Sequence, residues 1–168
     1  MNRQIVLIVH NLRSCHNVGA IFRTADGLGI NHLYLTGYTP YPISKTDQRL
    51  PHLRHQINQK IHKTALGAEN TIKWSHIEII DTVIDKLRRQ NFAIISLEQA
   101  KKSTNLVTYQ PPNKIAVIIG REIGGIEPTI LEQTDVTLEI PMFGQKESFN
   151  VVEAATMALY HFRFYTQN

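Results

Sequence analysis

The hydrophobic positions of this chain fall into short runs rich in β-branched residues, as expected of strands buried inside a parallel sheet. These runs lie at residues 4–9, 33–36, 92–97, 115–119 and 136–140. A further strand-like stretch surrounds Trp74. The last run ends at Pro141, which cannot donate a ladder hydrogen bond. We predict a strand at each of these places.

Other stretches repeat their apolar residues every three to four positions, which is the spacing of a helix with one buried face. The clearest is residues 17–28, whose apolar stripe is Val18, Ile21, Phe22, Ala25 and Leu28. Further helices are predicted at 81–90, at 127–133 and from residue 151 onward. Because strands and helices alternate, we predict an α/β domain with a mainly parallel sheet.

Two polar residues of the first predicted helix have ordinary structural explanations. Asn17 precedes the first apolar residue and can cap the helix N-terminus. Arg23 points nearly opposite the apolar stripe, at about 100° per residue, and fits an exposed arginine. Taken alone, both residues are better explained by structure than by chemistry.

Small and polar residues gather where the later strands are predicted to end. Gly120 follows one strand, Pro141 follows another, and Ser148-Phe149-Asn150 precedes the final helix. In open α/β sheets, ligands bind at the carboxyl ends of strands and at helix N-termini. The spacing therefore predicts a pocket here without naming its ligand.

Composition narrows the class of protein. The chain has 168 residues, of which 42% are hydrophobic and 19% charged, which is typical of one soluble globular domain. The early apolar run at 5–9 is too short for a signal-peptide core or a membrane span. A single cysteine, Cys15, excludes an internal disulfide, and a reducing cytoplasm is the simplest location.

Charge is unevenly distributed along the chain. Residues 1–68 contain eight Lys and Arg but only two acidic residues, giving +6, whereas the remainder carries −2. Six of the eight histidines also lie in the first part, but no metal-binding spacing is present and we predict no metal. The segment 43–63 is predicted to be a basic surface that touches phosphates. This split fits a nucleic-acid face beside a small-molecule pocket, although an uneven solvated surface explains it equally well.

The segment Gly120-Arg121-Glu122-Ile123-Gly124-Gly125 is neither a Rossmann fingerprint nor a Walker loop. Its glycines permit close backbone approach, and Glu122 places a carboxylate at a strand end. Asn150 and Glu153 have the spacing of a capping box. Each of these features alone is more simply structural than catalytic.

In combination, three segments resemble the motifs of the SpoU (TrmH-like) RNA methyltransferases in order and separation. The first is Asn17-x-Gly19-Ala20-Ile21-x-Arg23. The second is Gly120-x-Glu122-x-x-Gly125-Ile126. The third is Ile140-Pro141-Met142 followed by Ser148-Phe149-Asn150-Val151. The likeness covers nearly the whole chain. It departs from the family at Phe149, where leucine is usual, and at Val152-Glu153, where a small or apolar continuation is usual. These departures leave the expected catalytic side chains in place, but they are expected to alter the packing of the pocket.

The resemblance implies a single SPOUT methyltransferase domain over residues 1–168, with a C-terminal trefoil knot that general folding rules would not suggest. It implies a homodimer that uses S-adenosylmethionine to methylate a ribose 2′-hydroxyl of RNA. The residues expected to hold the cofactor are Leu97, Gly120, Ile140, Met142 and Phe149. The residues expected at the reacting atoms are Asn17, Arg23, Glu122, Ser148 and Asn150.

Arginine stays protonated in almost every protein setting, so we expect Arg23 to grip a phosphate and polarise the 2′-oxygen rather than to act as a base. Transfer RNA is expected over ribosomal RNA, because the chain looks like little more than a compact catalytic domain. Two alternatives remain open: a non-catalytic RNA-binding protein with the same fold, and an enzyme acting on a small nucleotide.

Overall fold

Within residues 3–166, seven parallel strands form one sheet at the centre of the protein, in the order β3-β2-β1-β6-β4-β7-β5. The computed structural model describes residues 3–166. The strands are β1 (Gln4–His10), β2 (His32–Thr36), β3 (Trp74–Ile77), β4 (Ala93–Leu97), β5 (Thr104–Asn105), β6 (Lys114–Ile119) and β7 (Val136–Glu139). Because neighbouring strands of this sheet are parallel, all their carboxyl ends meet at one edge.

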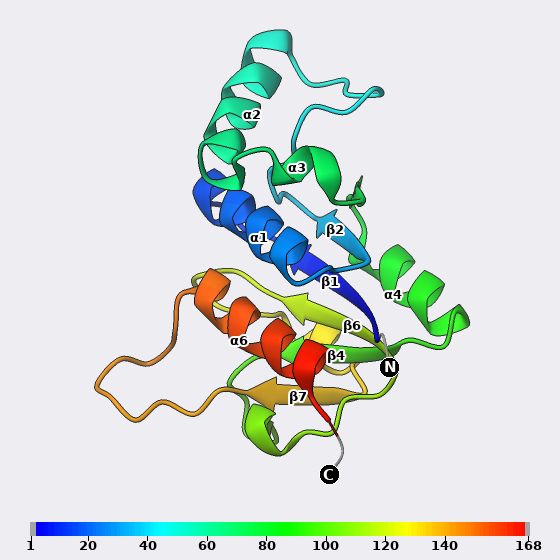
Figure 1. The fold of residues 1–168 in the computed structure, drawn as a ribbon, viewed down its shortest axis with the longest axis vertical. Coiled ribbons are helices and arrows are strands. Elements are labelled where there is room, and N and C mark those ends of the chain that lie inside the picture. Colours follow the sequence, from blue (N-terminus) through cyan, green and yellow to red (C-terminus); the bar gives the residue numbers. More distant parts are fainter. Residues whose placement is uncertain (1–2, 167–168) are drawn as a thin grey trace.

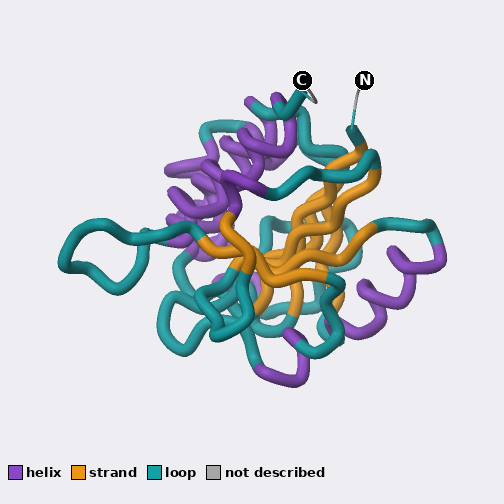
Figure 2. Tube along the Cα trace, turned by 90° about the horizontal axis from the view of Figure 1, so that it is seen from below, coloured by secondary structure: helices purple, strands orange, loops and turns teal. Residues whose placement is uncertain are grey.

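Helices cover both faces of this sheet (Figures 1 and 2). The helices are α1 (Cys15–Gly27), α2 (Pro51–Ala65), α3 (Ala68–Thr71), α4 (Ile80–Arg89), α5 (Pro128–Leu131) and α6 (Val151–Phe164). Side chains along β1 alternate between the two resulting cores. Leu7 and Val9 pack with α1 and α6, whereas Val6 and Ile8 pack with α4.

The predicted α/β class and most predicted elements are confirmed. The structure corrects one prediction and adds elements that the sequence did not predict. Ser14 caps α1 by accepting a hydrogen bond from the Asn17 backbone N–H (3.2 Å), so the prediction that Asn17 is the cap was wrong. The segment 43–63, predicted as a basic surface, contains most of helix α2, which the sequence did not predict. The stretch 98–113, for which no helix or strand was predicted, contains β5 and a short 3₁₀ helix (Leu106–Thr108).

Helix α2 lacks a strong apolar stripe because it buries only Ile61 and Ala65. The backbone of α2 instead packs closely against the backbone of α1. A Cβ atom on Gly19 would lie 3.0 Å from the Ala65 nitrogen, so the glycine permits the approach of the two helices. The Thr64 hydroxyl adds a hydrogen bond to the His16 carbonyl (2.8 Å). Glycine in the first motif therefore has a packing role.

The C-terminal end of α6 is fastened to the start of the sheet and the end of α1. The Arg163 guanidinium donates to the carbonyls of Leu28 (2.9 Å), Gly29 (2.6 Å) and Arg3 (2.9 Å). These bonds fix the helix whose other end reaches the carboxyl edge of the sheet. No helix within residues 3–166 is both long and apolar enough to cross a membrane.

Candidate functional site

A cavity of about 570 Å³ opens at the carboxyl edge of the sheet, where β4, β6 and β7 end. Its walls come from the segments that follow these strands and from the first turn of α6. The loop 140–150, which joins β7 to α6, extends away from the rest of the molecule (Figure 1, orange). The volume lies within the range of about 300–1,000 Å³ that is typical of small-molecule sites.

The glycine-containing loop after β6 folds back on itself to form one wall. The Arg121 backbone N–H donates to the Gly125 carbonyl (3.3 Å). Gly124 and Gly125 have φ values of +87° and +59°, which favour glycine. A Cβ atom on Gly125 would overlap the Glu98 carboxylate. That carboxylate accepts hydrogen bonds from the backbone N–H groups of Ile126 (2.9 Å) and Gln99 (3.0 Å), and so joins the loop to the end of β4.

Glu122 links this loop to the first motif. Its carboxylate accepts from the Asn17 side-chain amide (3.1 Å) and from the Arg13 backbone N–H (3.4 Å). Asn17 therefore has its amide at the border of the cavity, although it is not part of the wall. The contact joins two sequence segments that are 105 residues apart.

The N-terminal turn of α6 forms another wall. The Asn150 side chain caps this helix by accepting from the Val152 backbone N–H (2.8 Å), as the sequence predicted. Ser148 and Phe149 precede the cap and line the cavity. The cavity thus meets a helix N-terminus, whose exposed N–H groups favour negative charge.

Arg23 does not line this cavity. It lines an open cleft of about 510 Å³ between α1, α2 and α6, together with Lys63 and Val152. Val151 lines the cavity and its neighbour Val152 lines the cleft, so the first turn of α6 separates the two. Arg23 has no hydrogen-bonding or ion-pair partner among the described residues, and it is exposed.

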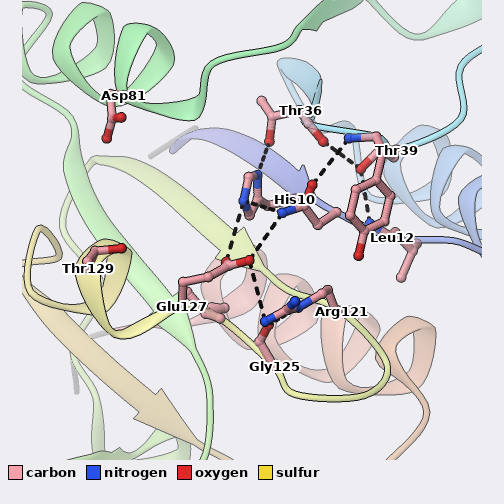
Figure 3. A network of polar contacts seen from close by, with 12 residues as sticks. His10, Leu12, Thr36, Thr39, Asp81, Arg121, Gly125, Glu127 and Thr129 are labelled. Carbon is pink, nitrogen blue, oxygen red and sulfur yellow. Dashed lines mark hydrogen bonds and ion pairs between the residues drawn. The ribbon is translucent and has the colours of Figure 1, made fainter.

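A buried polar network lies beside the loop at the end of β1 (Figure 3). The His10 ring bonds to the Thr36 hydroxyl through Nδ1 (2.8 Å) and to the Asn11 amide through Nε2 (2.8 Å). Asn11 also donates to Glu127 (3.2 Å), whose carboxylate lies 3.5 Å from Arg121. Burial lowers the pKa of His10, so the ring is neutral near pH 7. The network therefore links neutral His10, through Asn11 and Glu127, to Arg121 in the loop that follows β6 and forms a wall of the cavity.

Of the ten predicted site residues, six line the cavity: Leu97, Glu122, Ile140, Ser148, Phe149 and Asn150. Gly120 lies behind the wall, where a Cβ atom would come within 2.7 Å of the Gly125 carbonyl carbon. Met142 is half-buried and does not line the cavity. Asn17 reaches the site through Glu122, and Arg23 is in the separate cleft.

The sequence interpretation missed three charged residues of the wall: Glu98, Arg121 and Glu139. Glu139 is the last residue of β7, and the other two lie one and two residues past the ends of β4 and β6. Position at a strand end was the available signal. Within residues 3–166, no group of three or more His, Cys, Asp or Glu side chains could hold a metal ion.

The model of the SpoU rRNA Methylase family matches residues 4–160. A tRNA (guanosine(18)-2′-O)-methyltransferase of Aquifex aeolicus is 28% identical over 163 residues, covering 94% of this chain and 68% of that protein. The 23S rRNA (guanosine-2′-O-)-methyltransferase RlmB of Neisseria meningitidis serogroup B is 28% identical over 155 residues, covering 92% of this chain and 56% of the relative.

A solved structure with a similar fold is the SpoU methyltransferase AviRb of Streptomyces viridochromogenes in complex with AdoMet. It has a TM-score of 0.80 at 20% identity and covers 97% of this chain and 58% of that one. The chain thus spans between about half and two thirds of the length of these relatives. At this identity the structural likeness establishes the fold.

Proposed function

The chain belongs to the SpoU rRNA methylase family, and from this membership we propose that it transfers a methyl group from S-adenosylmethionine to a ribose 2′-hydroxyl of RNA. The observation that carries the proposal is the convergence of the three motif segments on one edge of the sheet. Glu122 of the second motif bonds to Asn17 of the first, and Asn150 of the third lines the same cavity as Glu122.

The residues of the cavity suit S-adenosylmethionine. Leu97 and Ile140 offer apolar walls for an adenine ring, and Phe149 is 38% exposed beside them. Three carboxylates line the same space, those of Glu98, Glu122 and Glu139, and they favour a cationic ligand. When bound, this cofactor supplies an electrophilic methyl group on a positively charged sulfur.

Methyl transfer forms the bond between the 2′-oxygen and the methyl carbon, breaks the bond between that carbon and sulfur, and releases the hydroxyl proton to solvent. The chain's own residues would position the ribose for this step. Glu122 and Asn17 form a hydrogen-bonded pair that can orient a ribose hydroxyl at the cavity border. Ser148 adds a hydroxyl donor in the same cavity. Alignment of the reacting atoms is expected to supply much of the rate.

Arg23 would act from the neighbouring cleft. Its exposed guanidinium and the ammonium of Lys63 line one open space, which suits the phosphate next to the target ribose. From there Arg23 would hold the phosphate and polarise the 2′-oxygen while remaining protonated.

We also propose that the chain forms a trefoil knot within one SPOUT catalytic unit. Support comes from the two loops that frame the cavity, 120–127 and 140–150, whose residues share its walls. Stretching single molecules by their two ends checks this. A tightened knot leaves the chain shorter than its contour, which is about 3.3–3.6 Å per residue, whereas a fully extended chain would contradict it.

A homodimer is proposed from the outer face of α6. Tyr160 and Phe164 are 59% and 58% exposed, with ring centroids 4.7 Å apart. With Met157 they border an open apolar hollow of about 420 Å³. Such patches usually mark interfaces, and a second copy would place the RNA site near the subunit boundary. A native mass equal to one chain would contradict the dimer.

Transfer RNA is the proposed substrate, with ribosomal RNA second, and the cytoplasm is the proposed location. A compact domain suits a compact RNA, and the Aquifex relative is named for tRNA while the Neisseria relative is named for 23S rRNA.

The test is methyl transfer from labelled S-adenosylmethionine to total transfer RNA and ribosomal RNA, followed by nucleoside analysis. We expect a labelled 2′-O-methylnucleoside from transfer RNA. Label on a base would overturn the chemistry. Cofactor binding without transfer to either RNA would favour a non-catalytic RNA-binding protein, and a substrate affinity independent of salt would favour a small nucleotide.

A further inference from the structure

The loop after β2 holds one exposed aromatic ring beside the site. Tyr38 is 50% exposed, although the residues on both sides of it are firmly held. Gly37 has φ +62° and packs against the Asn11 side chain. The Tyr38 backbone N–H donates to the Asn11 Oδ1 (3.2 Å), so the backbone at the ring is tied to the end of β1.

Thr39 anchors the other side of Tyr38. It is 1% exposed, and its hydroxyl contacts the carbonyls of Val9 (3.1 Å) and Thr36 (2.8 Å). The same hydroxyl accepts from the Leu12 backbone N–H (3.1 Å), as Figure 3 shows. The ring therefore stands on a rigid backbone, which lowers the entropy lost when a ligand packs on it.

Contacts of Arg13 place this ring next to the proposed ribose site. The Arg13 guanidinium lies over the Tyr38 ring, 5.9 Å from its centroid. The Arg13 backbone N–H donates to Glu122 (3.4 Å), which also accepts from Asn17 (3.1 Å). One residue thus contacts both the exposed ring and the carboxylate at the cavity border. Arg13 is itself exposed, so cation and ring both face solvent.

We propose that Tyr38 is a stacking platform for an RNA base at or next to the methylated nucleotide, with Arg13 as its cationic neighbour. This inference rests on the proposed function and adds a specificity-determining residue to it. Unpaired RNA bases commonly stack on aromatic rings and on arginine guanidinium planes. An aromatic ring accepts any base face, so this contact selects unstacked, single-stranded nucleotides rather than one sequence.

The test compares Tyr38→Leu with Tyr38→Phe, using transfer RNA as the probe. Tyr38→Leu removes the π face and is expected to weaken RNA binding by roughly 5- to 150-fold. The KM for RNA should rise, with unchanged cofactor affinity and unchanged slope of log affinity against log salt. Tyr38→Phe keeps the ring and should bind within about twofold of the wild type, since the hydroxyl is not needed for stacking.

Wild-type RNA affinity in Tyr38→Leu would overturn the proposal. So would a loss accompanied by a changed salt slope or by weaker cofactor binding, because either would show that the loop had moved. RNA binding can be measured even if the wild type transfers no methyl group. Failure of the proposed reaction and failure of the stacking platform are therefore distinguishable.

Discussion

The cavity and the neighbouring cleft differ in charge, although one turn of α6 separates them. The cavity wall contains three carboxylates and one arginine, whereas the cleft contains Arg23 and Lys63 and, among the described residues, no acid. An acidic wall favours a cationic ligand and a basic cleft favours phosphate. The comparison suggests that small molecule and nucleic acid are held by separate surfaces, which meet at the first turn of α6, where Val151 lines the cavity and Val152 lines the cleft.

The two surfaces also come from different parts of the chain. Residues of the cleft belong mainly to the basic first 68 positions, and those of the cavity belong to the later, slightly acidic part. A change on one surface should therefore leave ligand binding at the other intact. Each prediction below is designed to separate them.

The largest effect is expected from Arg23→Ala. Loss of the guanidinium should lower kcat by about 10²- to 10³-fold, the usual effect of removing one preorganised donor. Cofactor affinity should not change, because Arg23 does not line the cavity. Single-turnover methylation and calorimetric titration of S-adenosylmethionine measure the two quantities. Arg89→Ala, on α4 at the opposite face of the sheet, is the matched control.

Arg23→Lys tests whether the planar guanidinium is needed, or only its charge. A lysine keeps the charge but not the planar fork, so we expect it to recover little of the lost rate. Full activity of Arg23→Lys with an unchanged pH dependence would show that no planar guanidinium is needed, and would refute the proposed role.

Gly125→Ala should damage the cavity rather than the cleft. The residue has φ +59°, and its new Cβ atom would overlap the Glu98 carboxylate. Backbone strain of this kind costs about 1–3 kcal/mol. We expect the loop to shift and cofactor affinity to fall by at least about tenfold, while RNA affinity measured without cofactor falls by less, because the basic cleft does not include this loop.

Gly144→Ala provides the control for this change. Gly144 lies in the exposed loop after β7, and a Cβ atom there would meet nothing within 4 Å. It should bind cofactor normally. Equal cofactor affinities for the two variants would contradict the role assigned to the loop 120–125.

A smaller effect is expected from Lys63→Gln in the cleft. If this lysine meets one phosphate, its loss should weaken RNA binding several-fold and reduce the slope of log affinity against log salt by about one. Cofactor titration should be unaffected. Arg89→Gln is again the control, and an unchanged slope for Lys63→Gln would remove that residue from the RNA surface.

The sequence predicted the strands and the carboxyl-edge location because both depend on local periodicity. Runs of β-branched residues need only their neighbours in the chain to indicate a buried strand. Helix α2 was missed because it buries only Ile61 and Ala65, so its apolar signal is weak. The cap of α1 was misplaced because Ser14 and Asn17 are both good caps, and only the structure shows which side chain accepts the bond.

The site was harder to predict than the fold because it depends on contacts between distant segments. Position alone did not indicate that the Glu98 carboxylate would bond to Ile126. Nor did the motif reveal that Arg23 lies outside the cavity, since helical spacing only gives its direction from α1. Residue type and strand-end position predict which residues gather, and tertiary packing decides which wall each one joins.

The smallest effect is expected from removing the hydrogen bonds that hold the end of α2 beside the cleft. Glu69, whose side chain is 5% exposed, accepts from the His62 ring (2.5 Å) at the end of α2 and from the Gly67 N–H (3.0 Å). Burial acts to raise the pKa of Glu69, but hydrogen bonds from His62 and from backbone N–H groups outweigh it, so the pKa is lowered. A lowered pKa means that the ionised form stabilises the fold above the unfolded value of about 4.3 and that this stability is lost as pH falls through the folded value.

Glu69→Gln should therefore cost about 1–3 kcal/mol of unfolding free energy at pH 7, and the difference from the wild type should shrink as the pH falls below about 4. Urea unfolding at pH 7, 5 and 3 measures it, with the exposed Glu132→Gln as control. Because His62 adjoins Lys63, the variant should loosen the cleft and weaken RNA binding slightly, while cofactor affinity at pH 7 stays unchanged. An equal pH dependence in variant and wild type would show that Glu69 does not carry this stability. A parallel loss of cofactor affinity would show that cavity and cleft are coupled through the helical layer rather than independent.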